Sequence, residues 1–99
     1  MNAAMMNKIR KMQKDLQEAQ QKLQETVFVG KAGGVCEIEM KGTHEVLKVT
    51  IDKDAFETKD DIEMIEDALV SAYNDALKQI EDATAKMMGP YASMLGGVL

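Results

Sequence analysis

The stretch VCEIEMKGTHEVLKVTI, residues 35–51, contains two short runs in which apolar and polar side chains alternate. Such a period of two is typical of strands with one buried face. The residues predicted to share the covered face are Cys36, Ile38, Met40, Leu47, Val49 and Ile51. Between the runs, Lys41-Gly42-Thr43 predicts a tight turn. We therefore expect strands at about 35–41 and 45–51, paired antiparallel, with one covered and one polar face.

A third strand is predicted just upstream, at about residues 26–31. Its sequence, Thr-Val-Phe-Val-Gly-Lys, is rich in β-branched and aromatic residues. Ala32-Gly33-Gly34 follows, and successive glycines permit the positive φ of a tight turn. A phosphate-binding loop is not expected here, because no GxGxxG or Walker pattern accompanies the glycines. Together the three runs predict a three-stranded antiparallel meander.

A long helix is predicted on each side of the strands, at about residues 3–25 and 61–88. The first contains no Gly or Pro, and for the second Asp60 is the expected N-cap, with Glu63 as its capping-box partner. The expected apolar stripe of the second helix is Ile62, Ile65, Leu69, Ala72, Ala76, Ile80, Ala83 and Met87. This α-β-β-β-α order predicts a single α+β domain over residues 1–99, with both helices on one sheet face and a flexible tail at 89–99.

Apolar residues of the first helix recur at alternating steps of four and three, the period of a coiled coil. This seam consists of Met5, Ile9, Met12, Leu16, Ala19 and Leu23. A helix of this length is about 35 Å long, whereas strands are about 20 Å long, so part of the helix must project from the sheet. We expect the seam to build the protomer core and to supply an interface for a homodimer.

Charge is unevenly distributed along the chain. The net charge is −5, yet residues 1–25 carry five bases and three acids, and residues 60–99 carry two bases and eight acids. The bases of the first segment are Lys8, Arg10, Lys11, Lys14 and Lys22. A net acidic protein binds nucleic acid poorly by bulk charge alone. The simplest interpretation is that both segments are solvated helix faces, and acids in the first turns of the second helix suit the helix dipole.

Catalytic and metal-binding residues are scarce. Cys36 is the only cysteine and His44 the only histidine, so the chain has no intrachain disulfide, and a free thiol is typical of the reducing cytoplasm. The two lie on neighbouring predicted strands, but Cys36 alternates with apolar residues and is expected in the core. Neither ligand spacing nor a calcium loop is present. We predict no enzyme, no catalytic residue, no metal, no cofactor, no small-molecule substrate, no signal peptide and no membrane segment.

Four segments, taken in order, resemble the YbaB/EbfC family of bacterial nucleoid-associated proteins. They are Lys11-Met12-Gln13-Lys14, Gly30-Lys31-Ala32-Gly33-Gly34, Glu45-Val46-Leu47-Lys48-Val49-Thr50-Ile51-Asp52 and Ala72-Tyr73-Asn74-Asp75-Ala76. The resemblance covers roughly residues 5–88. It implies an α-β-β-β-α protomer and a tweezer-like homodimer in the cytoplasm and nucleoid. It also implies binding to double-stranded DNA with low or modest sequence specificity, which alters DNA conformation, nucleoid organisation and gene expression.

On this hypothesis the projecting first helices of a dimer grip the duplex. The residues expected to contact the DNA backbone are Lys8, Arg10, Lys11, Lys14, Lys22, Gln13 and Gln17. A rival hypothesis is a coiled-coil-like module that binds another protein through the same seam and never touches DNA. A third, a thiol enzyme or redox sensor built on Cys36, has the least support.

Overall fold

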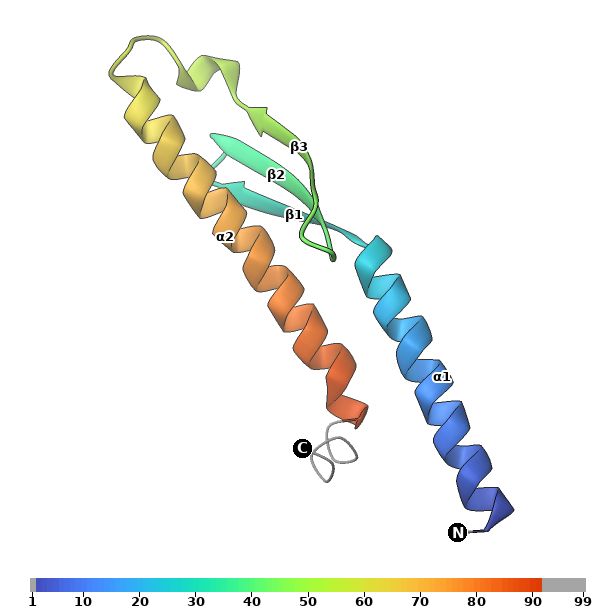
Figure 1. The fold of residues 1–99 in the computed structure, drawn as a ribbon. Helices are drawn as coiled ribbons and strands as arrows, with labels where there is room; N and C mark the ends of the chain where they lie inside the picture. Colours follow the sequence, from blue (N-terminus) through green and yellow to red (C-terminus); the bar gives the residue numbers. More distant parts are fainter. Residues whose placement is uncertain (1, 92–99) are drawn as a thin grey trace.

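Three antiparallel strands connect two long helices in an elongated molecule, 70 × 21 × 15 Å (Figure 1). The structure is a computed structural model and describes residues 2–91. Its elements in chain order are α1 (Ala3–Glu25), β1 (Val27–Ala32), β2 (Cys36–Lys41), β3 (Val46–Ile51), the 3-10 helix η1 (Lys53–Ala55), α2 (Asp61–Met88) and the 3-10 helix η2 (Gly89–Tyr91). The predicted α+β fold with α-β-β-β-α order is confirmed. Of the predicted flexible tail, residues 89–91 form η2, and residues 92–99 lie outside the described part.

The sheet is a meander with strand order β1-β2-β3. Gly33 and Gly34 form the first turn with φ of 52° and 80°, as their sequence predicts. The β2–β3 pairing shifts register between Glu39 and Met40, so that Met40 lies opposite Val46. This bulge gives β3 one more residue than strict alternation allows, which the sequence pattern did not indicate.

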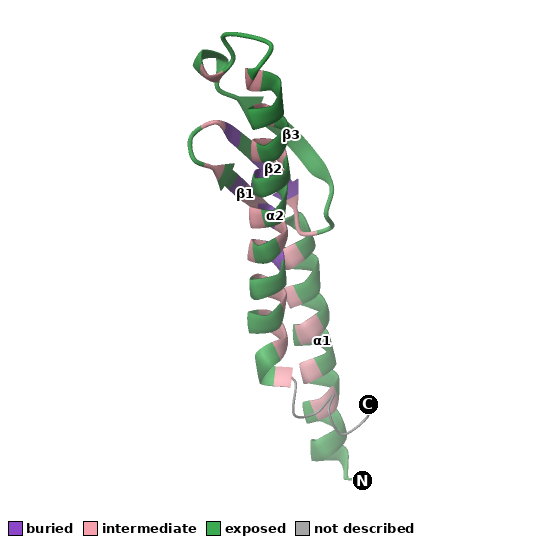
Figure 2. Cartoon of the chain, turned by 90° about the vertical axis from the view of Figure 1, so that its left-hand side faces the viewer, coloured by how far each residue is buried: buried purple, intermediate pink, exposed green. Residues whose placement is uncertain are grey.

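The core lies between β2 and the middle of α2. Its buried residues are Cys36, Ile38, Met40, Ala72, Ala76 and Ile80. The expected covered face of β2 and the centre of the α2 stripe are therefore both buried. The expectation that both helices cover the sheet is wrong, because α2 packs on β1 and β2 whereas α1 contains no buried residue (Figure 2).

Helix α2 approaches the sheet most closely at Gly30 of β1. A Cβ placed on Gly30 would overlap the backbone oxygen of Ala72 and would lie 2.7 Å from the nitrogen of Ala76. The absence of a side chain at Gly30, together with the small alanines of α2, thus permits direct contact between the helix and strand backbones.

Replacing Gly30 by alanine should therefore force the helix away from the sheet. We expect Gly30→Ala to lower the free energy of unfolding by about 3 kcal/mol. Urea unfolding followed by circular dichroism, at one fixed protein concentration, measures the change. Gly89→Ala is the matched control, because nothing lies within 4 Å of that position. Equal stability of the two variants would contradict the proposed close contact.

The two edges of the sheet differ. At β1, the backbone N–H of Lys31 donates to Asp75 Oδ2 (2.9 Å), and Gln79 Nε2 donates to the carbonyl of Val29 (2.8 Å). These side chains of α2 occupy two of the backbone hydrogen-bonding groups of the β1 edge. At the other edge all six residues of β3 are exposed. The predicted covered face is therefore wrong for β3, because α2 lies over the other two strands.

The two long helices begin differently. Asn2 accepts a hydrogen bond from the N–H of Met5 (2.8 Å) and caps α1. For α2 the predicted capping box is wrong, because the Asp60 side chain makes no cap hydrogen bond. Instead Asp61 Oδ2 accepts hydrogen bonds from the backbone N–H groups of Glu57 (2.9 Å) and Thr58 (3.0 Å). These hydrogen bonds lower the pKa of the Asp61 carboxyl and fix the loop ahead of the helix.

Candidate nucleic-acid interface

The first half of α1 projects beyond the rest of the described chain. The carbonyl of Leu23 lies against Gly42, and Gly42 lines a hollow together with Ile80. Leu23 and Ile80 therefore lie at similar positions along the long axis of the molecule. From there α1 continues for about 30 Å to Ala3, whereas α2 continues for only about 12 Å to Met88. Both views show α1 extending past the end of α2 (Figures 1 and 2). We call residues 3–14 the arm.

All seven residues predicted to contact DNA are exposed on α1. They are Lys8, Arg10, Gln13, Lys11, Lys14, Gln17 and Lys22. Successive helical residues turn by about 100°, so the side chains of Arg10, Lys11 and Lys14 lie opposite the apolar stripe, and Lys8 borders it. The helix therefore presents a polar face that is free of packing within the protomer.

The positive charge of α1 is concentrated in the arm. Residues 2–14 contain four bases and no acid, whereas residues 15–25 contain one base and three acids. Lys14 and Glu18 lie 4.0 Å apart with both side chains largely exposed, a pairing that contributes little to stability. The local charge of the arm is +4, twice the value for the whole of residues 1–25.

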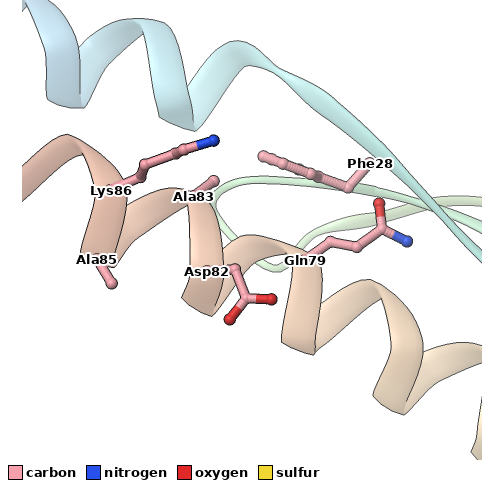
Figure 3. Close-up of a pocket in the computed structure, with 6 residues that line it drawn as sticks. All are labelled: Phe28, Gln79, Asp82, Ala83, Ala85 and Lys86. Carbon is pink, nitrogen blue, oxygen red and sulfur yellow. The ribbon is translucent and has the colours of Figure 1, made fainter.

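The acidic start of α2 lies far from the arm. Glu63, Glu66 and Asp67 are exposed near the end of the molecule that carries η1, and the arm is at the opposite end (Figure 1). Closer to α1, the Asp82 side chain points away from that helix, whereas Lys86 and Phe28 lie on the side of α2 that faces α1 (Figure 3). The fold thus separates positive charge from most of the negative charge, although the chain is acidic overall.

The predicted seam forms a partly covered stripe. Met5 is 56% exposed, and the other five seam residues are partly buried. None of the six belongs to the protomer core, contrary to expectation, because α1 is attached to the sheet only at its C-terminal end. The role of the seam in a dimer remains a prediction.

Groups suited to catalysis or metal binding do not converge. Cys36 is buried at the start of β2, and burial raises the pKa of its thiol, which keeps it protonated and unreactive. His44 is exposed in the turn beyond the other end of that strand. Within residues 2–91 no three His, Cys, Asp or Glu residues are placed to hold a metal ion, and no helix is long and apolar enough to cross a membrane.

Sequence reasoning missed two features of the sheet, one at each of its edge strands. Asp75 and Gln79 bind the edge of β1, although Asp75 lies within one of the four segments singled out by resemblance. The apolar face of β3 was expected to be covered, so its exposure went unrecognised. Only the placement of α2 over β1 and β2 reveals both.

The profile of the YbaB/EbfC DNA-binding family matches residues 1–95. The chain belongs to this family. A nucleoid-associated protein of Streptococcus thermophilus is 40% identical over 92% of each chain, and one of Legionella pneumophila is 42% identical over 81% of this chain and 70% of its own. The crystal structure of an uncharacterized Helicobacter pylori protein matches 80% of this YbaB/EbfC chain and 92% of its own, with a TM-score of 0.62 and 25% identity.

Proposed function

We propose that this YbaB/EbfC protein binds double-stranded DNA as a homodimer and grips the duplex with its two arms. DNA binding and association with the nucleoid follow from its family. The observation that supports the arm as the contact surface is its charge: four exposed bases and no acid on a helix that projects from the body. The cytoplasmic nucleoid is the corresponding location.

The arms would act mainly on the DNA backbone. Lys8, Arg10, Lys11 and Lys14 neutralise phosphates and release counterions, Lys22 adds to them nearer the body, and Gln13 and Gln17 donate hydrogen bonds to the backbone. No reader motif places a helix against base edges in this fold. Low or modest specificity is therefore expected, set by DNA shape and deformability, with consequences for nucleoid organisation and gene expression.

The homodimer would form at β3. Val49 and Ile51 pair across the sheet with the buried Ile38 and Cys36, so they lie on the face toward α2, but they are 45% and 36% exposed. Because Asp75 and Gln79 bind the β1 edge, the opposite flank of α2 faces β3.

That flank of α2 continues the apolar surface of β3. Its exposed members are Ile62, Val70 and Tyr73. A continuous apolar surface of this kind on a soluble protein indicates an interface. The unpaired edge of β3 is also open to a second strand, whereas the β1 edge is occupied. A second copy meets both requirements and doubles the number of arms.

A salt series tests DNA binding directly. A mobility-shift titration with duplex DNA between 50 and 200 mM salt should show affinity falling by at least about 1,000-fold, as expected for six to ten phosphate contacts. The oligomeric state is measured in the same buffers. A flat salt response would contradict the proposed arm contacts and favour the alternative, a module that binds protein through the seam.

A further inference from the structure

The seam forms an apolar stripe on α1 that continues into the arm, where no described element covers it. Met5 is 56% exposed, and Ile9 and Met12 are only partly buried. At about 2 Å per residue, η2 carries the chain roughly 6 Å beyond Met88, which brings Tyr91 near the height of Met12. From Met12 to the tip of the arm, the stripe lacks a partner among residues 2–91.

The segment that follows η2 has the composition to cover this stripe. Residues 92–99 read ASMLGGVL and contain no charged residue. Their large apolar side chains form two pairs, Met94-Leu95 and Val98-Leu99, separated by two glycines. Eight residues can span up to about 27 Å, whereas the distance along the arm from Met12 to Met5 is only about 10 Å. Tyr91 reaches the level of Met12, and the eight residues that follow it are long enough to span the distance to Met5.

We propose that residues 92–99 dock on the stripe of their own arm, between Met5 and Met12. The segment is uncharged and the stripe is apolar, so burial of both from water drives the contact. The bases that face DNA lie mainly on the other side of the helix and stay exposed. Docking would thus cover the exposed apolar stripe of the arm and leave its polar face available. This contact does not depend on whether DNA is bound.

Two other occupants are less well matched to the stripe. DNA phosphates gain nothing from apolar side chains, and the surface proposed for a second copy lies at β3, far from the arm tip (Figure 1). These occupants give different outcomes in a cross-linking experiment.

Paired cysteines test the docking in the full chain. In a Cys36→Ala background, Ile9→Cys is combined with Leu95→Cys, and the control combines Asn7→Cys with Leu95→Cys. Asn7 is exposed and lies about 160° around the helix from Ile9, at nearly the same height. A short bismaleimide should link the Ile9 pair within one chain at least tenfold faster than the Asn7 pair. Equal rates, or links that join two chains, would overturn the proposal.

A second variant gives a readout without cross-linking. Replacing Leu95 and Leu99 by aspartate leaves the described core unchanged, so the protein should still fold. The uncovered stripe should then raise the fluorescence of an added hydrophobic dye severalfold over the unmodified protein. A matched change of Ser93 to aspartate should give a smaller effect. Unchanged dye fluorescence in the double variant would contradict the docking.

Discussion

A protein with an uncharged arm should lose nearly all of its affinity for DNA. The variant replaces four residues by alanine: Lys8, Arg10, Lys11 and Lys14. In a dimer this removes eight positive charges, and with them most of the counterion release that drives backbone binding. We expect affinity at 50 mM salt to fall by about 1,000-fold or more, and the log–log salt slope to change from about −9 for ten bases to about −2 for the two remaining Lys22 side chains. Mobility shifts over a salt series measure both quantities.

The control for this variant keeps the same change in net charge but leaves the arm intact. It replaces four exposed lysines elsewhere by alanine: Lys48, Lys53, Lys59 and Lys78. If only total charge mattered, the two variants would weaken binding equally, which would contradict a role for the arm. Alanine favours helix formation, and the arm bases contribute nothing to the core, so circular dichroism should show that the helix is retained.

The sequence predicted the helices and strands better than it predicted which of them pack against one another. Apolar spacing on α1 identified a helix with one apolar side, but spacing does not reveal what covers that side. In the structure Met5 is exposed and Leu16 only partly buried, since α1 extends away from the sheet, which it joins only at Thr26. Similarly, alternation identified β3 as a strand. Whether Val49 is covered depends on where α2 lies, which is fixed by long-range contacts at Gly30.

The candidate site shows the same division. Composition revealed the bases of α1 and the acids of α2, and their sum argued against DNA binding. Their separation depends on the antiparallel course of α2, which brings its acidic start to the end of the molecule opposite the arm (Figure 1). The capping box predicted at Asp60 is also absent, because Asp61 instead accepts the hydrogen bonds that hold the preceding loop against the start of α2. Charge at a site is therefore a property of the fold, not of the total composition.

The β3 surface can be tested with one buried charge. In the proposed homodimer Val49 lies in the interface, and twofold symmetry places each substitution there twice. Val49→Lys should therefore raise the dimer dissociation constant by at least about 100-fold, because two ammonium groups must lose water without partners. Sedimentation velocity measures the dissociation constant. Thr50→Lys, one residue along and on the opposite face, adds the same charge and should leave the dimer intact.

This variant also links assembly to DNA binding. A monomer offers one arm, so its salt slope should be about half that of the dimer, and its affinity should fall accordingly. A Val49→Lys protein that remains dimeric would exclude β3 as the interface and leave the arm hypothesis standing. A monomeric variant with the full salt slope would instead show that one arm suffices, and the tweezer arrangement would then be wrong. The two measurements therefore separate how the protein assembles from how it holds DNA.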